Sequence, residues 1–127
     1  MNMSFQTDLG KVKGLGSSKH GFGHWWMQRM TAVLLVPTGL FVLISFLLLD
    51  VMTANAVLDW MQNPINSILL LLFALTACYH GALGLQVVVE DYIDSHVWQL
   101  IFLYLIKLSM ILLMMINTYA VSSVLLG

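Results

Sequence analysis

Three long stretches with at most one charged residue constrain this chain more than any other feature. Residues 30–49 and 60–89 contain no Asp, Glu, Lys or Arg, and residues 97–127 contain only Lys107. A helix needs about 20 mostly apolar residues to cross the hydrocarbon core of a bilayer, and each stretch is long enough. Lipid cannot hydrogen-bond the backbone, so each stretch must be helical. The sequence therefore predicts an all-α membrane protein with three transmembrane helices.

The composition supports the same class of protein. Only 9% of the 127 residues are charged, whereas a soluble domain carries about 25%. The net charge of −1 gives no reason to expect a nucleic-acid partner. We expect an N-terminal inner-side or interfacial segment over residues 1–28 and a three-helix anchor domain over 29–127. Its helices are predicted near residues 29–51, 65–90 and 97–123.

Local signals mark the ends of these helices. Asn63-Pro64 suits the start of the second helix, because proline is well tolerated in a first turn. Asp94-Ser95 can cap the third helix. Pro37 lies inside the first helix and predicts a kink there.

Basic residues give the expected orientation. Lys11, Lys13, Lys19 and Arg29 are four of the five basic residues, and the 50–64 connection has none. The positive-inside rule then places the N-terminus in the cytoplasm or the mitochondrial matrix. The first connection and the C-terminus are expected outside, and the second connection inside.

His80 is the first residue that a simple anchor does not need. It lies about ten residues before the inner end of the second helix, or roughly 15 Å deep. Ionisable groups at that depth are rare and usually functional. A neutral imidazole can bind a haem iron or another metal, and Gly81 and Gly84 leave room for a flat macrocycle. The alternative is a histidine hydrogen-bonded across helices, with glycines that serve only close packing.

Other polar residues near the inner membrane surface allow two interpretations each. Tyr92 beside Asp91 could hydrogen-bond a carbonyl of a lipid-soluble ligand, or belong to a solvated loop. Arg29 could bind haem propionates, or snorkel to the interface. His20 and His24 could belong to a proton path or a partner contact, or to a plain interfacial segment.

Two further polar residues carry no assigned role. His96 suits the same interfacial interpretation as the N-terminal histidines. Lys107, ten residues into the third stretch, could pair with a partner subunit, a lipid phosphate or a polar group of the bundle.

Together these features resemble the small hydrophobic anchor (D) subunits of succinate dehydrogenase, respiratory complex II. That family carries a second-helix histidine followed at fixed spacing by an Asp-Tyr pair, here His80 and Asp91-Tyr92. It also opens its first helix with an Arg-x-Thr-Ala pattern, here residues 29–32. The resemblance covers roughly residues 22–120.

The resemblance implies a role for each matching residue. His80 would be one axial ligand of a haem b, whose iron takes its other ligand from a companion C subunit. Tyr92 would hydrogen-bond ubiquinone, with Asp91 as support. Arg29 would lie near the haem propionates and the quinone. The three helices would then form part of a helical bundle shared with that companion membrane anchor subunit.

The implied activity belongs to a complex. A flavoprotein subunit would oxidise succinate in the tricarboxylic acid cycle, and an iron–sulfur subunit would pass the electrons to ubiquinone in the respiratory chain. This chain would be a subunit that binds no succinate and is inactive alone, in a bacterial or mitochondrial inner membrane. The alternatives are the anchor of a fumarate reductase and a cofactor-free structural membrane subunit.

Overall fold

The computed structural model describes residues 21–127. Lys11, Lys13, Lys19 and His20, with most of the expected N-terminal segment, lie outside these residues. The described chain forms four helices: α2 (Gly21–Leu47), α3 (Ala54–Met61), α4 (Pro64–Tyr92) and α5 (His96–Leu126). The helices α2, α4 and α5 are each long and apolar enough to cross a membrane. The prediction of an all-α protein with three transmembrane helices is confirmed.

The first long helix differs most from its expected bounds. It begins at Gly21 rather than near residue 29, and it ends at Leu47 rather than near residue 51. The Phe22 ring stacks on Trp25 and Trp26, with centroids 6.3 and 6.2 Å apart, so aromatic contacts extend the helix beyond its apolar stretch. The division expected after residue 28 therefore falls inside a continuous helix.

The short helix α3 lies in a connection for which no helix was predicted. Its N-cap is Thr53, whose hydroxyl accepts a hydrogen bond from the backbone N–H of Ala56 at 3.2 Å. Trp60 attaches the helix to the end of α2, with its ring 5.1 Å from Phe46 and 6.3 Å from Phe41. A side-chain cap and an aromatic cluster thus stabilise eight residues that the hydropathy pattern leaves undefined.

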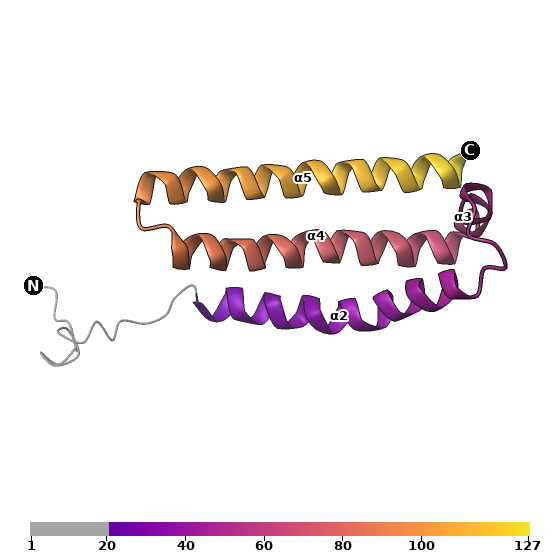
Figure 1. The fold of residues 1–127 in the computed structure, drawn as a ribbon, viewed down its shortest axis with the longest axis horizontal. Coiled ribbons are helices and arrows are strands. Elements are labelled where there is room, and N and C mark those ends of the chain that lie inside the picture. Colours follow the sequence, from indigo (N-terminus) through magenta and orange to yellow (C-terminus); the bar gives the residue numbers. More distant parts are fainter. Residues whose placement is uncertain (1–20) are drawn as a thin grey trace, which may run out of the picture.

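The two later helices begin where the sequence predicted. Pro64 occupies the first turn of α4, and the Asn63 side chain accepts a hydrogen bond from Ile65 N–H at 2.9 Å. Ser95 is the N-cap residue of α5, but its side chain makes no capping hydrogen bond. Pro37 lies inside α2, which bends along its length (Figure 1).

The helix α4 lies between α2 and α5 and packs against both (Figure 1). The three long helices form one layer, and successive long helices run antiparallel. The start of α2 and the α4–α5 connection therefore lie at one end of this layer. The short helix α3 and the C-terminus lie at the other end. Side chains on α4 therefore face α2 on one side and α5 on the other.

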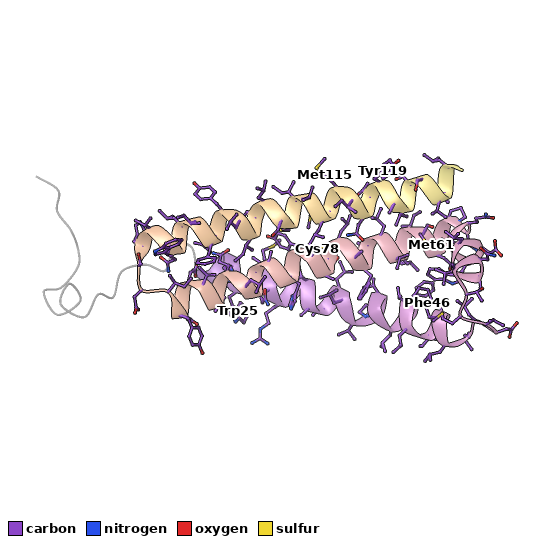
Figure 2. The ribbon with its side chains drawn as sticks, turned by 45° about the horizontal axis from the view of Figure 1, so that its top comes forward. Trp25, Phe46, Met61, Cys78, Met115 and Tyr119 are labelled. Carbon is purple, nitrogen blue, oxygen red and sulfur yellow. The ribbon has the colours of Figure 1, made fainter. Side chains whose placement is uncertain are left out.

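Small side chains fill the helix contacts. The buried residues of the described chain are Thr38, Val42, Ser67, Thr76, Val89 and Val121. Gly39 brings α2 close to α4, because a Cβ built there would lie 3.1 Å from Cε2 of Phe73. Large apolar side chains such as Met115 project outward instead (Figure 2). This arrangement is typical of membrane helices, whose close packing depends on small residues while large ones face lipid or other subunits.

Candidate functional site

His80 lies near the middle of α4, on the side that faces α2. It is 12 residues before Tyr92, where the 29-residue helix ends. The helix is continuous, so the two residues are separated by about 18 Å along its axis. The imidazole is half-buried. It is thus an ionisable group near the middle of an apolar helix.

One ring nitrogen of His80 is fixed by Thr31 of α2. Nδ1 lies 2.9 Å from the Thr31 hydroxyl oxygen. That hydroxyl also lies 2.8 Å from the backbone carbonyl of Met27 and 3.1 Å from that of Gln28, in both cases as a donor. A hydroxyl has one proton, so with that proton on the backbone its oxygen accepts from His80 Nδ1–H. This assignment leaves the lone pair of the imidazole on Nε2.

The second ring nitrogen faces Gln28. The Gln28 carboxamide nitrogen is 3.4 Å from Nε2 of His80, in position to donate to its lone pair. The other end of this amide, Oε1, is buried and has no hydrogen-bond partner in the described chain. His24, one turn earlier in α2, also has a buried Nε2 without a partner there. Two buried polar atoms without partners indicate that this region is built to receive a further polar group.

An open groove of about 680 Å³ lies between α2 and α4 beside these atoms. His24, Trp25, Gln28 and Arg29 line it from α2, and Gly84 and Glu90 line it from α4. The Arg29 guanidinium lies 5.4 Å from the centroid of the Trp25 ring, a cation–π contact. A Cβ built on Gly84 would lie 4.0 Å from the Gln28 amide nitrogen, so the glycine keeps the α4 side of the groove open.

These residues fit the haem that the resemblance implies. Within residues 21–127, no three His, Cys, Asp or Glu side chains gather as a metal site. A metal ion bound by His80 would therefore need ligands from a cofactor or another chain. Within the described residues, the only partner of His80 Nε2 is the Gln28 amide, at 3.4 Å. Together with the two unpartnered polar atoms and the open wall at Gly84, this matches what one side of a haem pocket requires.

The structure does not bring Tyr92 and Asp91 into this groove. Both are exposed at the C-terminal end of α4, and Tyr92 is 82% exposed. The neighbouring Glu90 does line the groove, where its carboxylate accepts a hydrogen bond from the Gln86 amide at 2.7 Å. The two predicted groups of site residues are thus separate: His80 and Arg29 lie at the α2–α4 contact, and Asp91-Tyr92 at the end of α4.

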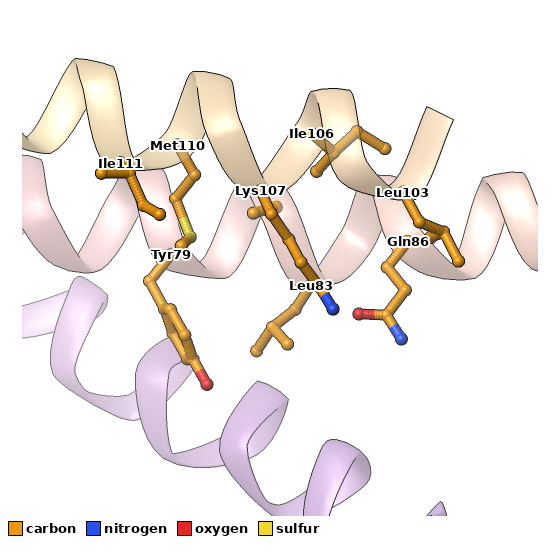
Figure 3. Close-up of a pocket in the computed structure, with 9 residues that line it drawn as sticks. Tyr79, Leu83, Gln86, Leu103, Ile106, Lys107, Met110 and Ile111 are labelled. Carbon is orange, nitrogen blue, oxygen red and sulfur yellow. The ribbon is translucent and has the colours of Figure 1, made fainter. Parts of the chain in front are cut away.

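Other residues singled out in the sequence lie away from this groove. His96 is exposed at the start of α5. Lys107 points into a second pocket, of about 240 Å³ between α4 and α5, on the same side as Tyr79 and Gln86 (Figure 3). Cys78 lines a third pocket, also between α4 and α5 (Figure 2).

Sequence reasoning assigned no role to Gln28 or Thr31, although both contact His80. Their spacing in the sequence could have identified them. His24, Gln28 and Thr31 follow one another at spacings of four and three residues, which places them on one face of an otherwise apolar helix. A polar stripe of this kind marks the face that a membrane helix turns away from lipid.

A family model and several known proteins match this chain. The family described as Succinate dehydrogenase/Fumarate reductase transmembrane subunit matches residues 3–121. The succinate dehydrogenase hydrophobic membrane anchor subunit of Rickettsia bellii is 40% identical over 96 residues, which cover 76% of this chain and 77% of the relative. That of Rickettsia typhi is 34% identical over 113 residues, covering 88% and 90%.

A further relative widens the range of organisms. The succinate dehydrogenase membrane anchor subunit of Reclinomonas americana is 28% identical over 93 residues, which cover 71% of this chain and 78% of the relative. No solved structure shows significant similarity. The match of the family model over nearly the whole chain and the three spans lead to one conclusion. The chain belongs to the succinate dehydrogenase/fumarate reductase transmembrane subunit family, among its hydrophobic membrane anchor subunits.

Proposed function

We propose that this chain supplies one axial ligand of a haem b that it shares with a companion membrane anchor subunit. The observation that carries the proposal is the set of contacts made by the two ring nitrogens of His80. Its Nδ1 lies 2.9 Å from the Thr31 hydroxyl, and its Nε2 lies 3.4 Å from the amide of Gln28, a residue that lines the groove. The other axial ligand would be a histidine of the companion subunit.

Haem b held there would supply a one-electron redox centre and a bridge between the two anchor subunits. The residues of this chain would hold it in different ways. His80 would bind the iron through Nε2. Arg29, exposed at the mouth of the groove, would attract the propionates, because a guanidinium pairs well with carboxylates.

We further propose that Tyr92 hydrogen-bonds a ubiquinone carbonyl, with Asp91 as its support. Both side chains are exposed at the end of α4. A phenol there can donate to a carbonyl at the membrane surface, while the quinone tail remains in lipid. The rest of the quinone pocket would come from the companion anchor and the iron–sulfur subunit.

The proposed complex adds a flavoprotein subunit that oxidises succinate on the inner side of the membrane. Electrons would pass through the iron–sulfur subunit to ubiquinone near Tyr92. The N-terminus would then lie in the cytoplasm or the mitochondrial matrix. In this arrangement the chain anchors the complex and shapes the quinone and haem sites, but it binds no succinate.

Replacement of His80 tests the haem proposal. In the purified complex, His80→Ala should remove or shift the b-type absorption spectrum while the flavin content of the complex is retained. His96→Ala is the matched control, because His96 is exposed at the start of α5 and contacts neither Gln28 nor Thr31. An unchanged haem spectrum in His80→Ala would support a cofactor-free structural subunit instead.

The direction of the reaction defines a second candidate, the anchor of a fumarate reductase, because the family model covers both enzymes. The relatives in Rickettsia and Reclinomonas are succinate dehydrogenase subunits, which favours succinate oxidation. The ratio of succinate oxidation to fumarate reduction by the purified complex, measured with quinones of different potential, separates the two.

A further inference from the structure

The contact between His80 and Thr31 gives Thr31 a role of its own beside the haem ligand. We propose that Thr31 is the positioning residue for His80: its hydroxyl holds the Nδ1 proton, and this fixes the ring with Nε2 toward the haem iron. The inference rests on the proposed haem site and specifies how this chain prepares its ligand.

The geometry gives Thr31 a defined hydrogen-bonding direction. Its hydroxyl donates to Met27 O at 2.8 Å within its own helix, which leaves the oxygen lone pairs for His80. The distance from Nδ1 to that oxygen is 2.9 Å, an ordinary hydrogen-bond length. The proton on His80 Nδ1 is thus linked through Thr31 to a backbone carbonyl of α2.

This link determines which nitrogen of the ring can bind a metal. Histidine ligands of metal ions almost always donate their other N–H to an oxygen acceptor, which sets both the tautomer and the ring orientation. Loss of such an acceptor typically costs about 10- to 100-fold in metal affinity or activity. A donated hydrogen bond also makes the imidazole more electron-rich, which stabilises ferric over ferrous iron.

Two variants of Thr31 separate the hydroxyl from the shape of the side chain. Thr31→Val keeps the branched shape and removes the hydroxyl, so the assembled complex should lose haem about tenfold more readily. Its haem midpoint potential should rise, and its low-spin ferric EPR signal should shift because the ring is free to turn. Thr31→Ser keeps the hydroxyl and should restore the potential and the EPR signal. Thr118→Val is the control, because Thr118 bonds a backbone carbonyl of α5 at 2.8 Å without contacting His80.

The results show separately whether the positioning role of Thr31 or the ligand role of His80 is wrong. If Thr31→Val leaves haem retention, potential and EPR signal unchanged while His80→Ala loses the haem, the positioning role is wrong and the ligand role stands. If Thr31→Ser shifts the potential as far as Thr31→Val, the hydroxyl is not the determinant and the inference is again wrong. If His80→Ala keeps the wild-type haem spectrum, both proposals fail.

Discussion

The amide nitrogen of Gln28 lies 3.4 Å from Nε2 of His80, the ring atom that would bind a haem iron. Iron and the amide cannot share one lone pair. Binding of haem would therefore require the Gln28 side chain to move. Its Oε1 is buried without a partner in the described chain, so the amide makes few hydrogen bonds in its present position. Gln28 thus occupies the ligand direction without being strongly held there.

We expect Gln28→Ala to leave haem binding intact or to strengthen it slightly. The hydrogen bond that the amide would give up has a net worth of about 1 kcal/mol, so the apparent haem affinity should rise by no more than about fivefold. Titration of the apo-complex with limiting haem measures this. Gln99→Ala, which removes an amide that donates to the Glu90 carbonyl at 3.4 Å, is the control. A tenfold loss of haem in Gln28→Ala would show that the amide holds the cofactor instead.

The two glycines after His80 should respond differently to a large side chain. Gly84 faces the groove between α2 and α4, and its Cβ would lie 4.0 Å from the Gln28 amide nitrogen. Gly81 lines a pocket between α4 and α5, where a Cβ meets nothing within 4 Å. Gly84→Leu should therefore lower haem content by filling the groove, at a cost of about 1–3 kcal/mol. Gly81→Leu should retain the haem. Equal haem content in both variants would contradict a cofactor site on the α2 side of α4.

Contact between Gly39 and Phe73 should control the packing of α2 on α4. A Cβ at Gly39 would lie 3.1 Å from Cε2 of Phe73, so Gly39→Leu forces the helices apart. We expect a loss of about 1–3 kcal/mol and a lower thermal midpoint of the detergent-solubilised complex. Gly23→Leu, at a position with nothing within 4 Å, should leave the midpoint unchanged.

The milder variant Gly39→Ala allows a rescue experiment. Phe73→Leu shortens the opposing ring, so the double variant should be more stable than the sum of the single changes predicts. Strict additivity of the two changes would show that the two residues do not contact each other in the assembled protein.

The sequence could predict the spans but not all of their bounds. Long charge-free stretches identify transmembrane helices because the bilayer makes hydropathy the dominant constraint. The early start of α2 and the short helix α3 depend instead on ring stacking at Phe22 and on the contacts of Trp60. Such contacts depend on which side chains meet, and hydropathy carries no information about that.

The candidate site was also predictable from the sequence only in part. His80 is recognisable from sequence, because an imidazole in an apolar stretch is rare. Its partners Gln28 and Thr31 lie 52 and 49 residues away in the chain, and only the register of α2 against α4 brings them to the ring. Helical spacing identifies their face of α2, but it does not fix which residue of α4 that face meets.

Tyr92→Phe should lower quinone reduction selectively. Loss of one hydrogen bond to a quinone carbonyl corresponds to about 1 kcal/mol, or about a fivefold fall in kcat/KM for quinone. Succinate oxidation with an artificial acceptor should be unchanged, because in the proposed complex that reaction bypasses the quinone site. Tyr119→Phe provides the control, since Tyr119 is similarly exposed but lies in the C-terminal part of α5 (Figure 2). Equal loss of both activities in Tyr92→Phe would contradict a quinone role.

The orientation of the layer can be tested with single cysteines. Ser95 lies between α4 and α5, and Asn55 lies in α3 at the opposite end of the layer (Figure 1). Both are exposed, and Cys78 can be replaced by alanine to give a background without other cysteines. With the N-terminus inside, a membrane-impermeant thiol reagent should label Asn55→Cys from outside and Ser95→Cys only from inside.

Each alternative labelling pattern contradicts a different part of the proposal. Labelling of Ser95→Cys and Asn55→Cys from the same side would contradict a span by α4, because that helix separates the two positions. Labelling of Ser95→Cys from outside and of Asn55→Cys only from inside would be consistent with the spans, but it would reverse their orientation in the membrane. Tyr92, three residues before Ser95, would then face the outer surface. Electrons from succinate oxidised inside could not reach a quinone at Tyr92 by the proposed route, so the quinone role would be wrong even with the fold intact.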